Sequence, residues 1–202
     1  MNRLTTRRHR NTLALLVAVL TMTAAPTATP SAAATEAAAR GQVCIFLAPN
    51  DVDPAGPRPP LGHNGWGFRH GASSSWTYGA TEGMTGRPQA TFIRTGSGRQ
   101  MMHNFKTRRT GKWRYAKYRC IATASAYPAR AMQAALAGRN SGYDFFRNNC
   151  LTKSVDVFRA YSPWLSASGH LPNARYRNTS WPPNYYYNTL LSKAGWSRSH
   201  NL

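Results

Sequence analysis

The N-terminal 34 residues have the pattern of an export signal, so the folded domain is expected within the residues that follow. Four arginines precede a short apolar run, Thr12–Leu20, and small residues then lead to two Ala-x-Ala sites, Ala32–Ala34 and Ala37–Ala39. This pattern is typical of a cleaved secretory signal, whereas a membrane anchor needs a longer apolar run. We therefore predict a secreted protein, with a signal peptide over residues 1–34 and a flexible leader over residues 35–41.

The chain is strongly basic, with 26 lysines and arginines against 6 aspartates and glutamates. Removal of the predicted signal takes away four arginines and no acidic residue, so (26 − 4) − 6 leaves a net charge of +16. A hydrophobic fraction of 42%, with 11% aromatic residues, nevertheless predicts a packed core and excludes a disordered basic tail. Beyond the N-terminus no apolar run reaches the length of a membrane span, so none is expected.

The order of the expected elements predicts an α+β domain over residues 42–161. Strands come first, with a hairpin at their centre, and two helices follow, one ending before Gly138 and one ending at Pro163. Ser125 is the expected cap of the first helix. Residues 162–202, rich in aromatics, proline and asparagine, are expected to pack on the domain as irregular structure. The expected strand segments are Gln42–Ala48, Gly62–His70, Ser73–Glu82 and Tyr115–Ala122, with one further strand or pair within Arg94–Arg119.

Three cysteines are present, Cys44, Cys120 and Cys150. An oxidising compartment favours pairing, and an odd number leaves one thiol free. Cys44 and Cys120 both lie in expected strands, so a disulfide between neighbouring strands is the preferred pairing. The alternative is that Cys150 takes part in the disulfide and one of the other two is free.

Cys150 stands where the second helix begins, after Asn148 and Asn149. Either asparagine can cap the helix, and the free N–H groups and helix dipole at this end favour a thiolate and can stabilise an oxyanion. A nucleophilic thiol needs a base, for which His63, in a glycine-rich strand, is the leading candidate. The alternatives are that Cys150 is a buried structural thiol and that His63 is a satisfied strand histidine.

Two segments, GHNGWGFR…WTYGATEG and, downstream, YDFFRNNCLT, resemble the circularly permuted branch of the papain-like, NlpC-like hydrolases. The resemblance covers residues 42–161 and implies a papain-like fold in which Cys150 is the nucleophile and His63 the base of a thiol-protease-like peptidase or amidase. For the third catalytic residue, Glu82 is the only carboxylate in the hairpin, although it also suits a turn or a salt bridge. His70, Thr77 and Tyr78 are neighbouring polar residues, and the sequence leaves open which face of the sheet each side chain occupies.

The implied substrate is a peptide, glycopeptide or lipid-like molecule of the cell envelope, and the enzyme is expected to be a monomer that uses no cofactor. The Ala- and Arg-rich signal segment favours a bacterial source. No histidine spacing suggests a metal site. The densest basic segment suits anionic polymers such as wall teichoic acid, or nucleic acid, so a non-catalytic cationic binding protein is the main alternative. A nuclease using His63 and His103 is less favoured. The basic residues of this segment are Arg94, Arg99, Lys106, Arg108, Arg109, Lys112, Arg114, Lys117 and Arg119.

Overall fold

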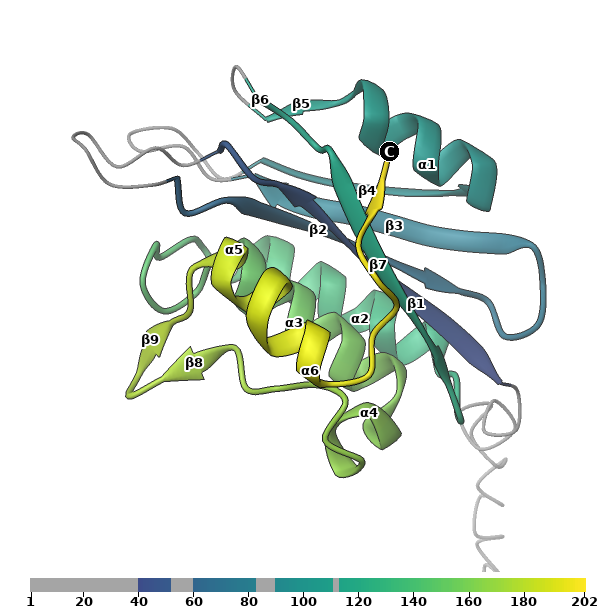
Figure 1. The fold of residues 1–202 in the computed structure, drawn as a ribbon. Helices are drawn as coiled ribbons and strands as arrows, with labels where there is room; N and C mark the ends of the chain where they lie inside the picture. The colour runs from purple at the N-terminus through teal and green to yellow at the C-terminus, as the bar shows by residue number, and fades with distance from the viewer. Residues whose placement is uncertain (1–39, 52–59, 83–89, 111–112) are drawn as a thin grey trace, which may run out of the picture. The chain divides into compact units, whose positions relative to one another are not determined.

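An antiparallel sheet of six strands runs through the domain in the order β10–β7–β1–β2–β3–β4 (Figure 1). The computed structural model describes residues 40–51, 60–82, 90–110 and 113–202, so the predicted signal peptide lies outside the described residues. The predicted leader is one residue too long, because Gly41 already pairs with β7. The sheet strands are β1 (Gly41–Ala48), β2 (His63–Arg69), β3 (Ser75–Glu82), β4 (Ala90–Ser97), β7 (Lys117–Thr123) and β10 (His200–Asn201).

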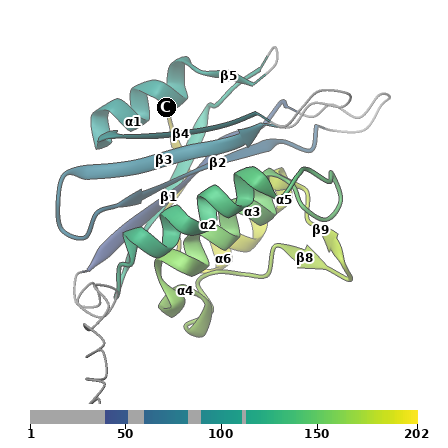
Figure 2. The same cartoon turned by 180° about the vertical axis from the view of Figure 1, so that it is seen from behind.

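Helices cover both faces of this sheet. Helix α1 lies on one face, while α2, α3 and α6 lie on the other, and α2 packs beside α3 (Figures 1 and 2). The predicted α+β class with an antiparallel sheet is therefore confirmed. The helices are α1 (Gly98–Thr107), α2 (Pro128–Asn140), α3 (Cys150–Tyr161), α4 (Pro163–Ala167), α5 (Pro183–Tyr185) and α6 (Leu191–Lys193), with a π-helical segment over Tyr186–Leu190. Four two-residue strands form two small antiparallel ribbons: β5 (Arg109–Thr110) pairs with β6 (Trp113–Arg114), and β8 (Arg175–Tyr176) pairs with β9 (Thr179–Ser180).

The central strand β1 is buried on both faces, because alternate side chains enter two separate cores. Val43, Ile45 and Leu47 belong to the core under α2 and α3, and Cys44 and Phe46 belong to the core under α1. Since successive strand residues point to opposite faces, a continuous apolar run suits a strand covered on both sides. The predicted hairpin is also confirmed, with β2 and β3 antiparallel and Trp66 opposite Gly79.

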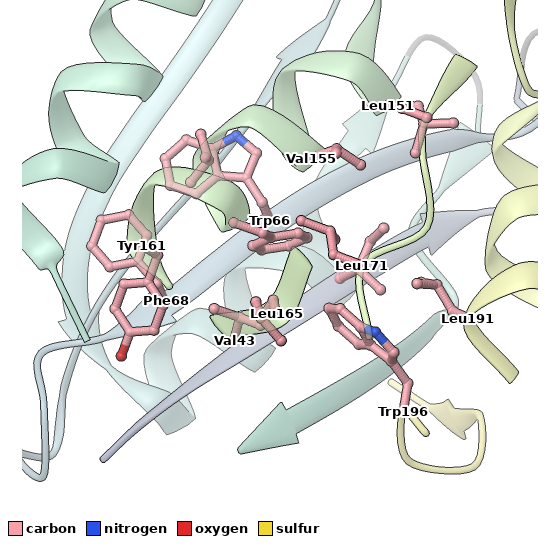
Figure 3. Packing of buried hydrophobic residues seen from close by; sticks show 14 of the residues in the cluster. Val43, Trp66, Phe68, Leu151, Val155, Tyr161, Leu165, Leu171, Leu191 and Trp196 are labelled. Carbon is pink, nitrogen blue, oxygen red and sulfur yellow. The ribbon is translucent and has the colours of Figure 1, made fainter. Parts of the chain in front are cut away.

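Helix α3 is anchored on the sheet along its whole length. Leu151, Val155 and Tyr161 face Trp66 and Phe68 of β2, as Figure 3 shows, and all five side chains are buried. At the far end of the helix, the Tyr161 hydroxyl donates to the carbonyl of Arg69 over 2.6 Å. This packing fixes the position of the first residue of α3 relative to the sheet.

The C-terminal segment 162–202 is part of the main core. Leu165, Leu171, Leu191 and Trp196 are buried in the cluster that contains α3 (Figure 3), and β10 adds a strand to the sheet beside β7. The expectation that this segment packs on the domain is in agreement with the structure. The expectation of irregular structure is wrong in part, because helical turns run from Pro183 to Lys193.

Two further details differ from the sequence prediction. Helix α1 occupies a region where only strands were expected; it begins at a capping box between Ser97 and Gln100 and buries only Met101 and Phe105. Ser125 does not cap α2, since its hydroxyl pairs with that of Ser162 and no side chain caps this helix. Helix α1 was not expected from the sequence because its narrow apolar stripe, within a basic segment, gives only a weak helical pattern.

The sulfur atoms of Cys44 and Cys120 lie 2.00 Å apart, at disulfide distance, on adjacent strands and at a sequence separation of 76 residues. A disulfide that closes so long a loop restricts the unfolded chain, so its removal is expected to lower the free energy of unfolding by about 4 kcal/mol. The double variant Cys44→Ser, Cys120→Ser should therefore melt about 10 °C lower in a calorimetric scan. Cys150→Ser is the matched control with both paired cysteines intact, and equal losses in the two variants would contradict a structural disulfide.

Candidate functional site

Cys150 is the first residue of α3 and the one free cysteine among the described residues. The side-chain oxygen of Asn149 accepts hydrogen bonds from the N–H groups of Leu151 and Thr152, over 3.0 and 3.2 Å. The Thr152 hydroxyl in turn accepts from the Asn149 N–H, which completes a capping box. Of the two asparagines that the sequence offers as the cap, Asn149 takes this role, and Asn148 instead donates to the preceding loop at Ser141. The cap leaves the N–H of Cys150 itself unused.

His63 begins β2 and is only 2% exposed, as is Cys150. Cys150 is close enough to act on the pKa of this imidazole through both its charge and a side-chain hydrogen bond. The ring atom Nε2 is buried without a partner among the described residues. The structure therefore brings together the two side chains that the sequence analysis selected from distant segments.

The two groups shift each other's proton affinity. Burial raises the pKa of Cys150, but the charge and hydrogen bond of His63 outweigh it, so the pKa lies below that of an ordinary thiol. Burial lowers the pKa of His63, but the negative charge of Cys150 and the bond to it outweigh burial, so this pKa lies above that of an ordinary imidazole. Both shifts favour a thiolate–imidazolium pair.

Two further groups contact the sulfur or its backbone. The backbone N–H of Asn64 donates to the sulfur, which also lowers the pKa of Cys150. The Tyr143 hydroxyl contacts both the sulfur and the backbone N–H of Cys150, and burial followed by the charge of Cys150 raises the pKa of this phenol. Tyr143 therefore stays protonated and can donate a hydrogen bond beside the nucleophile.

Tyr143 reaches Cys150 because the loop between α2 and α3 folds back on itself. The Asp144 carboxylate accepts from the backbone N–H groups of Phe146 and Arg147, both over 2.8 Å. The buried ammonium of Lys153 holds the start of this loop by donating to the carbonyls of Gly138 and Gly142. Burial lowers the pKa of Lys153 to about 8. The sequence analysis missed Tyr143, because only this fold of the loop brings it near the thiol.

Glu82 does not hydrogen-bond to His63 in this structure. Both of its carboxylate oxygens accept from the guanidinium of Arg108 over 2.8 Å, which is the salt-bridge alternative. Its negative charge, with that of Asp51, still contributes to the raised pKa of His63. The ring of Tyr115 lies 5.8 Å from that of His63, measured between centroids, and the Tyr115 hydroxyl is buried without a partner among the described residues.

The other candidates for a third residue lie elsewhere in the sheet. Nε2 of His70 bonds to the hydroxyl of Thr77 over 2.8 Å, and the Tyr78 hydroxyl accepts a bond from Asn104 of α1. His103 is exposed on α1, on the other face of the sheet from α3. The structure thus gives no support to a site that combines His63 with His103.

The C-terminal segment holds the loops on both sides of the site. The Asn184 amide donates to the carbonyls of Pro49 and Pro60, over 2.8 and 2.7 Å, just before the strand that carries His63. Gly62 has a φ of +82°, and a Cβ there would lie 2.5 Å from Asn184. On the other side, the Ser180 N–H donates to the carbonyl of Phe146 over 2.6 Å. Residues predicted to lie outside the catalytic domain therefore shape the site.

A hollow of about 270 Å³ opens beside Cys150. Tyr143 and Asn149 line it next to the thiol, and the C-terminal segment forms its far wall. Nowhere in the described ranges are three His, Cys, Asp or Glu side chains grouped so that they could hold a metal ion. No helix in the described part of the chain is long and apolar enough to cross a membrane.

The site thus combines a free thiol at a capped helix start, an imidazole bonded to it, and a phenol beside both. Asn64, Tyr143 and Lys153 are the contributors that the sequence analysis missed. Comparison with known proteins adds no relative to this geometry: no protein family, no curated protein and no solved structure matches the chain.

Proposed function

We propose that the protein is a secreted cysteine hydrolase of the permuted papain-like, NlpC-like type, which cleaves an amide or ester bond through Cys150 and His63. The observation that carries the proposal is the pairing of a free thiol at the start of α3 with a buried imidazole, each of which shifts the pKa of the other in the opposite direction. Perturbed and coupled groups of this kind concentrate at catalytic sites. An antiparallel sheet packed against the helix that carries the thiol is also what the resemblance implies.

In the first step the Cys150 thiolate attacks the carbonyl carbon of the substrate. The electron pair of the C=O bond moves to oxygen, and the backbone N–H of Cys150 and the hydroxyl of Tyr143 donate to this oxyanion in place of the contact that they make with each other. As the oxyanion collapses, the bond to the leaving amine or alcohol breaks, and the His63 imidazolium gives its proton to the leaving group. The products are a Cys150 thioester and a neutral imidazole.

In the second step water attacks the thioester. Neutral His63 removes a proton from the water, the C–S bond breaks, and the thiolate–imidazolium pair forms again. The acyl group leaves as a carboxylic acid. Each turnover therefore consumes one water and needs no oxidant, reductant or cofactor.

Trapping the thioester tests this proposal. The full mature protein, mixed with p-nitrophenyl acetate and quenched in acid within the first turnover, should gain one acetyl group at Cys150 by peptide mass spectrometry. Brief hydroxylamine treatment should remove this mass, because thioesters are cleaved rapidly. Acetylation only on lysines, or equal acetylation of the Cys150→Ser variant, would refute an acyl-enzyme on this thiol.

Tyr143→Phe removes one of the two proposed oxyanion donors and keeps the ring. We expect kcat/KM for the same ester to fall about 10²-fold, because the oxyanion then has a single donor. Tyr127→Phe, at the opposite end of α2, is the matched control and should keep its rate. An unchanged rate in Tyr143→Phe would exclude the phenol from the oxyanion site, although the Cys150–His63 pair could still act.

A second candidate function, binding of anionic polymers without catalysis, is favoured by a separate observation. On the α1 side of the sheet, Arg94 and Arg109 line a hollow of about 330 Å³ together with Arg108, whose guanidinium is bound to Glu82. Guanidinium groups arranged in this way suit phosphate or carboxylate groups. Binding to a teichoic acid or to DNA should then weaken steeply between low and high salt, and Cys150→Ser should bind as well as the native protein.

A further inference from the structure

The hollow beside Cys150 has a mostly apolar lining, in contrast to the strongly basic composition of the chain. Its walls include Leu61, Phe145, Phe146, Trp181, Pro182 and Pro183, and apart from the Cys150 thiolate none of the described residues that line it is charged. Phe145 and Phe146 are 40% and 62% exposed, so apolar surface continues outward from the mouth. Large exposed aromatics grouped beside a cavity mark a binding surface.

The aromatic wall is held firmly in place. The Trp181 ring lies 4.9 Å from that of Tyr185 and 5.1 Å from that of Tyr176, measured between centroids. The backbone of Trp181 is fixed by its N–H bond to the carbonyl of Ala174 over 2.9 Å. The opposite wall, Phe145 and Phe146, is anchored by the bond from the Ser180 N–H. The cavity therefore exists before any ligand arrives, which reduces the entropic cost of binding.

We infer that this hollow takes an apolar, aliphatic acyl chain, and that the substrate is an acyl ester or acyl amide rather than a carboxylate-bearing wall peptide. The inference rests on the proposed function, because the chain would carry the carbonyl that Cys150 attacks. A buried carboxylate needs a cationic partner, and none of the described basic side chains lines the hollow. The basic hollow under α1 is lined by other residues on the other face of the sheet.

The size of the hollow sets the preferred chain length. A methylene group needs roughly the space of a water molecule, ~30 Å³, so 270 Å³ holds about nine such groups. Each methylene that enters is expected to raise kcat/KM about fourfold, which corresponds to about 0.8 kcal/mol. The rate should stop rising once the hollow is full, near eight to ten carbons.

The first experiment measures kcat/KM of the full mature protein for p-nitrophenyl esters from acetate to dodecanoate. We expect the six methylenes added between two and eight carbons, at about fourfold each, to raise the rate about 4 × 10³-fold, followed by a plateau. Phe146→Ala should lower the ratio of the octanoate rate to the acetate rate about tenfold. Leu136→Ala removes a partly exposed apolar side chain on α2 that does not line the hollow, and should leave this ratio unchanged.

The second experiment needs no turnover. Octanamide, present in excess, should slow the alkylation of Cys150 by iodoacetamide at least fivefold, whereas acetamide and the anion of succinamic acid should not. A flat chain-length series that still depends on Cys150 would overturn the inference and keep the hydrolase. Ester cleavage that is independent of Cys150 would refute the hydrolase, and the protection experiment would then decide about the chain site alone.

The acyl group could reach the site on a soluble ester, an acylated peptide or a lipid. Octanoyl-glycine amide and dioctanoylphosphatidylcholine, each compared with its butanoyl analogue, separate these sources. Preference for the longer chain on any of these carriers supports the inference and identifies the carrier. Equal rates for both chain lengths on all of them would contradict it.

Discussion

Cys150→Ser is expected to lower kcat/KM for p-nitrophenyl esters at least about 10³-fold, because a serine hydroxyl in the same place is a far weaker nucleophile at neutral pH. The pKa of Cys150 lies below the ordinary value, so the native enzyme holds a thiolate that serine cannot reproduce. The exchange of sulfur for oxygen is small enough for the buried position at the start of α3. Steady-state kinetics with matched protein concentrations measures the effect.

Two controls separate chemistry from folding in this experiment. The melting temperature of Cys150→Ser should lie within a few degrees of the native value, since Asn149 still caps the helix. Polyanion binding should be unchanged, because the arginine-lined hollow lies under α1. Retention of more than one tenth of the native rate by a correctly folded Cys150→Ser protein would exclude this thiol as the nucleophile.

His63→Ala is expected to lower the rate at which iodoacetamide alkylates Cys150 at pH 6 about 10²-fold. Without the imidazole, its charge and hydrogen bond no longer lower the pKa of Cys150, and burial, the largest single influence, outweighs the remaining bond from Asn64 and raises this pKa above its ordinary value. A thiol of pKa about 8.5 or higher is less than 1% thiolate at pH 6, and only the thiolate reacts. His103→Ala is the matched control, since this histidine is exposed on α1.

The pH dependence of hydrolysis follows from the same two shifts. The rate should rise with pH through the lowered pKa of Cys150, as the thiolate forms, and fall through the raised pKa of His63, as the imidazolium loses the proton it gives to the leaving group. In His63→Ala the falling limb should disappear. Persistence of the same bell-shaped profile in this variant would assign the second ionisation to another group.

The sequence carried enough local information to place Cys150 and its cap. An asparagine directly before the thiol and the spacing of Leu151 and Val155 predict the start and the buried face of α3, and both depend on neighbouring residues only. The strand that begins at His63 was equally accessible from its composition. The pairing of Cys44 with Cys120 followed from the assignment of both to strands, together with an odd cysteine count.

What escaped prediction depends on long-range contacts. Glu82 looked available as a third catalytic residue because its partner, Arg108, stands 26 positions away. Asn184 meets Pro49 at a separation of 135 residues, and no local pattern in the tail suggests that it supports the strand of His63. Tyr143 is close in sequence, but its role depends on a loop turned by Asp144 and held by Lys153.

Titration of the Cys150 thiolate tests the central claim most directly. Ultraviolet absorbance of the thiolate near 240 nm, followed from pH 3 to 10 and corrected with Cys150→Ser, reports the ionisation of this sulfur alone. We expect a midpoint clearly below that of a free thiol in the native protein, and a midpoint above it in His63→Ala. Midpoints that coincide in the two proteins, at or above the free-thiol value, would show that the imidazole does not act on the sulfur.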